Sequence, residues 1–197
     1  MFGRTIKSDS VGIELKAFAK SDIPQLLKYI NKPETNKWLC IDTSYTNETE
    51  EAWYDDLLVN PKKFIWGIYI NGEIIGTASV ININYMTRCA EIALMIGNNK
   101  YYKRGIGTEV TKCLCDFCFN ELNSECIYYI VSEANIPSIK IAEKNDFKES
   151  GFIPHYFYRD GKYYSAIIKY KLRYEAEEPT EEPTEAIEEA VAPTETE

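Results

Sequence analysis

The residues best suited to chemistry lie in the stretch "IGNNKYYKRGIGTEV", residues 96–110. Gly105 and Gly107 stand two apart and follow Lys103 and Arg104, where an apolar run gives way to a helix-like pattern. Glycines at a helix start leave backbone N–H groups unshielded, and those groups together with the helix dipole favour an anion. The stretch therefore predicts either a turn that only joins a strand to a helix, or a site for the phosphates of a cofactor.

Two common phosphate-binding motifs are excluded. The Walker A string GxxxxGK[ST] does not occur in the chain. A dinucleotide fingerprint needs a third glycine, and Val110 occupies that position. Two glycines alone do not decide between a plain turn and a ligand site.

The chain has the composition of one globular domain followed by an acidic tail. It has 197 residues, of which 45% are hydrophobic, enough for one domain with a full core. The net charge of -9 comes from residues 176–197, which hold nine Glu and no Lys or Arg. Residues 1–175 balance 22 acidic against 22 basic side chains, which argues against a nucleic-acid partner.

The two ends of the chain support the same division. The tail repeats EEPT and has no aromatic residue, so we expect 176–197 to be disordered and 1–175 to be the domain. The N-terminal stretch has no signal-peptide h-region, and no apolar run approaches the roughly 18 residues of a membrane span. These features predict a cytoplasmic protein with no membrane partner.

Three of the six cysteines, Cys113, Cys115 and Cys118, fall within one predicted helix. Cys113 and Cys115 would point about 200° apart on that helix, and no second CxxC is present. We therefore expect buried, reduced thiols and no metal site.

The hydrophobic pattern predicts an α/β (α+β) domain in the order β-α-α-β-β-β-α-β-α-β-β, a mixed, largely antiparallel sheet flanked by helices. Asn71-Gly72 and Asp160-Gly161 each separate two strand-like runs and predict hairpin turns. The strands are expected at 11–19, 64–70, 73–85, 89–97 and 126–132 and in the hairpin 152–172, and the helices at 20–32, 47–60, 110–122 and 135–145.

Two motifs carry a resemblance to a known family. The stretch 96–110 is similar to the pyrophosphate loop of the GNAT superfamily of acyl-CoA-dependent N-acetyltransferases, with Tyr102 where many members have Gln or Arg. "NIPSIKIAEKNDF", residues 135–147, resembles the family's Asn-x-x-Ser/Ala helix. The resemblance covers about residues 11–174 and is strongest to the branch of ribosomal-protein N-terminal and spermidine acetyltransferases.

This resemblance implies acetyl-CoA as co-substrate and assigns residues to it. The backbone amides from Lys103 to Thr108 would bind the pyrophosphate. The backbone of Met95 and Gly97 would pair with the pantetheine arm, and Asn135 would hydrogen-bond that arm from the other side. The six loop positions are Lys103, Arg104, Gly105, Ile106, Gly107 and Thr108.

The expected acid is a serine. Many members of the family use a Tyr to protonate the leaving thiolate, but Ala142 stands at that position, so Ser138 is the expected donor. The alternative for Ser138 is a helix-start hydroxyl that bonds the backbone of its own turn.

The expected base is Glu91, acting through a water. Phe157 replaces a glutamate that some members of the branch use, and the alternative for Glu91 is a salt bridge at a strand edge. His155, the only histidine, is a further candidate. Pro154 and Ser165 also depart from the branch pattern, so the acceptor is not inherited from it.

The leading hypothesis is an N-acetyltransferase that moves an acetyl group from acetyl-CoA directly to a primary amine acceptor. Without a strong base, an α-amine (about 14% neutral at pH 7) is favoured over a lysine amine (about 0.04% neutral), which predicts a preference for protein N-termini. The alternatives are a non-catalytic acyl-CoA-binding module and a small-molecule acetyltransferase for polyamines or aminoglycosides. The sequence leaves open whether the protein is a monomer or a homodimer.

Overall fold

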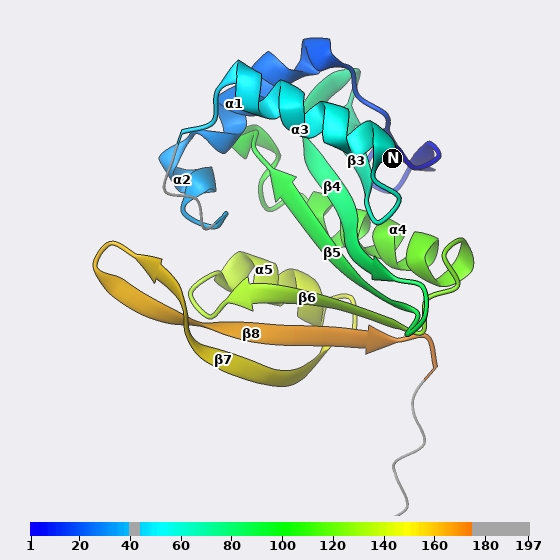
Figure 1. Ribbon diagram of the computed structural model, residues 1–197, viewed down its shortest axis with the longest axis vertical. Helices are drawn as coiled ribbons and strands as arrows, with labels where there is room; N and C mark the ends of the chain where they lie inside the picture. Colours follow the sequence, from blue (N-terminus) through cyan, green and yellow to red (C-terminus); the bar gives the residue numbers. More distant parts are fainter. Residues whose placement is uncertain (40–43, 175–197) are drawn as a thin grey trace, which may run out of the picture.

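A computed structural model describes residues 1–39 and 44–174 and shows one sheet covered by helices on both faces (Figure 1). The predicted domain boundary at 175, the tail 176–197 and Cys40 lie outside the described residues. None of the helices in the described ranges is long and apolar enough to cross a membrane.

The predicted element order is confirmed, with short additions. Strand β1, helix α2 and two 3-10 helices, at Lys20–Asp22 and Asn99–Tyr101, were not predicted, because three or four residues are too few for a hydrophobic period to appear. The strands are β1 (Ile6–Ser8), β2 (Ile13–Lys16), β3 (Phe64–Ile70), β4 (Glu73–Asn84), β5 (Cys89–Ile96), β6 (Cys126–Ser132), β7 (Lys148–Arg159) and β8 (Lys162–Leu172). The helices are α1 (Ile23–Ile30), α2 (Pro33–Asn36), α3 (Asn47–Val59), α4 (Ile106–Asn120) and α5 (Ile136–Glu143).

The eight strands form a single sheet in the order β1-β2-β3-β4-β5-β6-β8-β7. Neighbouring strands are antiparallel except β5 and β6, which are parallel and pair only from Cys89 to Glu91 on β5. Beyond Glu91 the two strands diverge, and Figure 1 shows the wedge that opens between them. This opening exposes an edge of β5 in the middle of the sheet.

Both predicted hairpin turns are confirmed by their backbone angles. Asn71 and Gly72 have φ of 49° and 81°, and Asp160 and Gly161 have φ of 51° and 76°. Consecutive positive φ values are the requirement of the two-residue turn that the sequence predicted.

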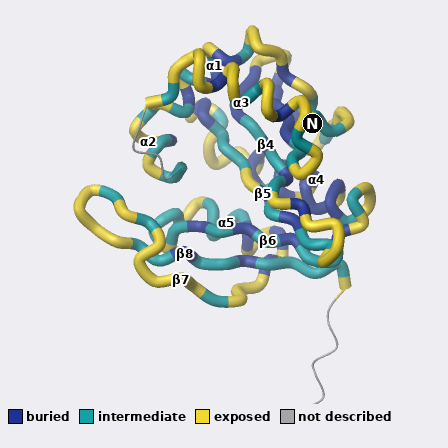
Figure 2. Tube along the Cα trace, in the orientation of Figure 1, coloured by how far each residue is buried: buried dark blue, intermediate teal, exposed yellow. Residues whose placement is uncertain are grey.

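The sheet has a separate core on each face. One core packs α4 and α5 against the sheet, and the smaller one packs α1 and α3 against the other face (Figure 2). Side chains of a strand alternate between faces, so buried Ala90 and Ile92 of β5 face α4, while Met95 packs against the α1–α3 core. Strand β5 thereby contributes side chains to both cores.

Cys113, Cys115 and Cys118 are buried and free, as predicted. Burial raises the pKa of the Cys115 thiol to about 12, so the thiol stays protonated at neutral pH. No cluster of potential metal ligands occurs among residues 1–39 and 44–174.

Candidate active site

The loop before α4 presents a row of free backbone donors. None of the N–H groups of the six loop residues 103–108 donates a hydrogen bond within the described chain, whereas the next amide, that of Glu109, donates to the Gly105 carbonyl at 3.0 Å. These amides lie at the N-terminus of the 15-residue helix α4, where the helix dipole adds positive potential. The arrangement fits an anion such as a pyrophosphate.

The backbone conformation of this loop explains Gly105. Gly105 is the N-cap of α4 with φ 79° and no side-chain cap, and Lys103 also has a positive φ of 59°. A β-carbon on Gly105 would meet only Val11 Cγ1, at 3.8 Å, so its surroundings do not require a glycine. The left-handed backbone and the open approach to the amides are the two reasons for a glycine here.

Gly107 has a packing role that the sequence did not suggest. It is buried in the first turn of α4, and a β-carbon there would lie 2.6 Å from Ile141 Cδ1. The residue therefore allows α4 to pack closely on α5. The expectation that Gly107 also leaves the loop amides unshielded stays a prediction.

The open edge of β5 lies next to the loop. The Gly97 N–H donates to the Ile75 carbonyl at 2.8 Å, so this amide is directed toward β4, and only the Gly97 carbonyl is left for a pantetheine arm. Met95 lies where β5 has already separated from β6. The pairing of Met95 and Gly97 with pantetheine stays a prediction.

On the far side of the opening, Asn135 and Ser138 begin helix α5. Asn135 is the N-cap, and its side-chain oxygen accepts a hydrogen bond from the Ser138 N–H at 3.4 Å. The Ser138 carbonyl accepts one from the Tyr129 hydroxyl at 2.9 Å. The Ser138 hydroxyl also interacts with the Tyr129 hydroxyl. No hydrogen bond from the Ser138 hydroxyl to the backbone of its own turn is found among the described residues. Ala142 is fully buried.

Glu91 lies on the same face of β5 as Met95. Its parity along the strand matches that of Met95, four residues or about 13 Å away. The Asn82 side-chain amide donates to the Glu91 carboxylate at 2.7 Å, so the contact found for Glu91 is a hydrogen bond from an uncharged group and not the alternative salt bridge. The role of Glu91 as a base stays a prediction. His155 is exposed on β7, where its ring stacks on Tyr163 with a centroid distance of 4.9 Å.

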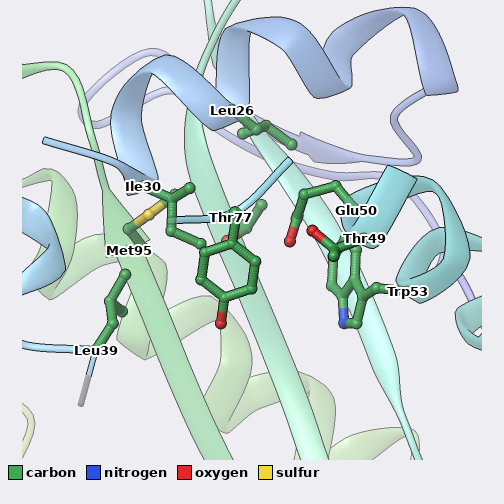
Figure 3. Close-up of a pocket in the computed structure, with 9 residues that line it drawn as sticks. Leu26, Ile30, Leu39, Thr49, Glu50, Trp53, Thr77 and Met95 are labelled. Carbon is green, nitrogen blue, oxygen red and sulfur yellow. The ribbon is translucent and has the colours of Figure 1, made fainter. Parts of the chain in front are cut away.

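A cavity of about 230 Å³ lies between α1, α3 and the ends of β4 and β5 (Figure 3). Glu50 reaches into it from the first turn of α3, and only 8% of that residue is exposed. Burial raises the pKa of Glu50 above its ordinary value. Neither Glu91, Ser138 nor His155 lines this cavity; its lining residues are Leu26, Ile30, Leu39, Tyr45, Thr49, Glu50, Trp53, Thr77 and Met95.

Sequence reasoning missed Glu50. Acidic residues are common in the first turn of a helix because the helix dipole favours them, so Glu50 does not stand out in the sequence. A signal was present, because Glu50, Trp53 and Leu57 recur at i, i+3 and i+7 and therefore share one helix face. A carboxylate on an otherwise apolar face of a helix is the sequence pattern that could have identified Glu50.

Residues 13–148 match the model of the acetyltransferase (GNAT) domain. The chain belongs to the GNAT acetyltransferase family. Members of this family use acetyl-CoA as co-substrate, and the free amides before α4 fit its pyrophosphate. The expected family, fold and acetyltransferase activity are thereby confirmed.

Relatives of this GNAT domain include spermidine acetyltransferases. The chain is 26% identical over 161 residues to the spermidine N(1)-acetyltransferase of Escherichia coli K12, covering 79% of this chain and 83% of the relative. It is 27% identical over 150 residues to the N-acetyltransferase p20 of Bacillus licheniformis, covering 73% and 83%. A solved spermidine N-acetyltransferase from Vibrio cholerae, in complex with CoA and spermine, has a TM-score of 0.77 at 21% identity, covering 82% of this chain and 95% of that one.

Proposed function

We propose that this protein transfers the acetyl group of acetyl-CoA directly to a primary amine of a small linear alkylamine of the polyamine class. The observation that carries the proposal is the row of free amides from 103 to 108, beside the open edge of β5 and near a cavity that contains Met95. The polyamine class is supported by the names of the relatives in Escherichia coli and Vibrio cholerae.

Several of the predicted residues have a role in this proposal. The amides of 103–108 neutralise the pyrophosphate, with Lys103 and Arg104 exposed at the rim. The Met95 backbone and the Asn135 side-chain amide orient the pantetheine arm. The Ser138 hydroxyl, which interacts with the Tyr129 hydroxyl, protonates the thiolate that leaves.

The predicted preference for protein N-termini assumed that the site has no strong base, and Glu50 removes the reason for that assumption. That preference followed from the lack of a strong base, which would leave only weakly basic amines reactive. Glu50 is a buried carboxylate in the cavity that we assign to the acceptor, and its raised pKa suits it to accept a proton better than an ordinary glutamate. A basic alkylamine is therefore a reasonable acceptor.

An acceptor screen tests the proposal. Purified protein is mixed with acetyl-CoA and, separately, with spermidine, 1,4-diaminobutane, an aminoglycoside and a peptide with a free N-terminus, and thiol release is followed. We expect the linear amines to give the highest kcat/KM. Binding of acetyl-CoA without turnover of any amine would contradict the proposal and favour a non-catalytic acyl-CoA-binding module.

A further inference from the structure

We propose that the cavity between α1 and α3 is the acceptor site, and that the Glu50 carboxylate binds the ammonium group of the acceptor and removes its proton. This inference rests on the proposed function, because it names the group of this protein that receives the amine.

Glu50 is a buried charge without a protein partner. Only 8% of the residue is exposed, and its carboxylate neither accepts a hydrogen bond nor forms an ion pair within residues 1–39 and 44–174. Lys169 is equally buried, at 7% exposure, but its ammonium lies 2.9 Å from the Glu149 carboxylate. Because an unpaired buried charge is costly, the open partner position of Glu50 indicates a cationic ligand.

The local structure holds this carboxylate in place. Thr46 caps α3 by accepting a hydrogen bond from the Thr49 N–H at 3.3 Å, which fixes the helix start at Asn47, three residues before Glu50. The helix N-terminus also favours a negative charge in the first turn. Figure 3 shows the Glu50 side chain reaching from α3 toward the middle of the cavity.

The rest of the cavity suits an alkyl chain that carries a positive charge. Leu26, Ile30 and Leu39 offer apolar surface for methylene groups, and no Lys or Arg lines the cavity. Aromatic rings stabilise ammonium groups through their faces, and Trp53 and Tyr45 are the rings available.

Asn31, at the C-terminal end of α1, holds Tyr45 against this site. Its side chain donates to the Tyr45 carbonyl at 2.9 Å and accepts from the Tyr45 N–H at 3.0 Å. Tyr45 is the other ionisable side chain among the described residues that line the cavity, and burial together with the Glu50 charge raises its pKa. It is therefore neutral at the pH values at which Glu50 titrates.

The proton balance of the step is complete. The bound ammonium gives one proton to Glu50, and the neutral amine attacks the thioester carbonyl. A C–N bond forms and the C–S bond breaks. The second amine proton reaches the thiolate through the Ser138 hydroxyl, so the products are the acetamide and CoA thiol. Glu50 then releases its proton to water.

The test compares Glu50→Gln with Glu51→Gln on the best acceptor of the wild-type enzyme. Glu51 is the next residue of α3 and is exposed, so its variant is the matched control. We expect Glu50→Gln to lower kcat/KM by about 10²–10⁴-fold, the contribution of a positioned base, with unchanged affinity for CoA by calorimetry. Glu51→Gln should match the wild type.

The pH profile separates a base from a structural residue. When Glu50 takes the proton, wild-type kcat/KM is level around neutral pH and falls on the acid side. The Glu50→Gln variant can use only acceptor that is already a neutral amine in solution. Because that fraction grows with pH, its kcat/KM should rise about tenfold per pH unit across the same range. If Glu50→Gln fails to fold, the wild-type profile still decides, because a continuous tenfold rise per unit would overturn the inference.

Failure of the inference and failure of the proposed function give different results. A wild-type enzyme that acetylates no amine contradicts the proposed function. A wild-type enzyme that acetylates linear amines, together with an equally active Glu50→Gln variant, overturns only the role of Glu50.

Discussion

At the scale of single residues, the buried charges of Glu50 and Lys169 differ in whether they have an ion-pair partner. Lys169 has an ion-pair partner in Glu149, and Glu50 has none among the described residues. The Glu50 pKa is raised because burial disfavours its charged form. The folded protein therefore binds a proton at Glu50 more readily than the unfolded chain does, and ionising Glu50 at neutral pH costs stability.

This sign predicts that Glu50→Gln is more stable than the wild type at pH 7. The stability penalty of Glu50 is absent below its ordinary value of 4.5, where it is protonated in both states, and grows as pH rises toward the raised folded pKa. We expect a gain on the order of 1 kcal/mol, or a Tm rise of roughly 2–4 °C, that disappears as pH falls to about 4.5.

Thermal unfolding at several pH values checks this prediction, with Glu51→Gln as the control that should not change. A Glu50→Gln variant that melts below the wild type at pH 7 would mean that the carboxylate stabilises the fold, and its unpaired state would then need another explanation.

The candidate cofactor loop is easier to predict from the sequence than the proposed acceptor site. The loop has a local signature, since Gly105 and the amides around it are contiguous in the chain. The residues that line the proposed acceptor cavity come from α1, the segment before α3, α3 itself, β4 and β5. They are far apart in the chain, so no short stretch of sequence contains them together. Glu50 could be recognised as buried only once the packing of α3 was known.

At the scale of elements, the start of α4 is the feature on which cofactor binding depends. Gly105 and Lys103 both have left-handed backbone conformations. The six backbone N–H groups of residues 103–108 have no hydrogen-bond partner in the described chain. Such a cluster of amides is costly to leave without a ligand or water. The shape of the loop therefore supports the proposal that it binds an anion.

Replacing Gly105 by Val should remove acetyl-CoA binding. A β-branched side chain would cover the amides and would strain a residue at φ 79° by about 1–2 kcal/mol. Gly72→Val is the matched control, because Gly72 has φ 81°, lies in open space and belongs to the β3–β4 turn. Both variants should lose similar stability, and only Gly105→Val should lose affinity by calorimetry. Equal CoA affinity in the two variants would refute the loop assignment.

Hydrophobic periodicity predicted the long elements, and its failures share a cause. The pattern found α3, α4 and the strands of seven or more residues, because each presents several turns or alternations. It missed β1 and α2, with three and four residues. The distance over which β5 and β6 stay paired depends on contacts between separate segments, and periodicity does not report it.

At the scale of the whole molecule, the proposed cofactor site and the proposed acceptor site lie on opposite faces of the sheet, and the opening between β5 and β6 connects them. The free amides belong to the α4 side, while the cavity with Glu50 belongs to the α1–α3 side. Strand β5 contributes to both, and beyond Glu91 it no longer pairs with β6. An acyl chain that enters through this wedge from one side can meet an amine that enters from the other, which is the geometry of direct transfer.

The most direct test of this account is a competition for the acetyl group. Spermidine, a peptide with a free N-terminus and its N-terminally blocked, lysine-containing twin are mixed at equal concentration with acetyl-CoA and the wild-type enzyme at pH 7. Mass spectrometry then follows which species gains the acetyl mass. The account predicts that spermidine is acetylated first and that Glu50→Gln suppresses this product. Faster acetylation of the free peptide N-terminus would contradict it.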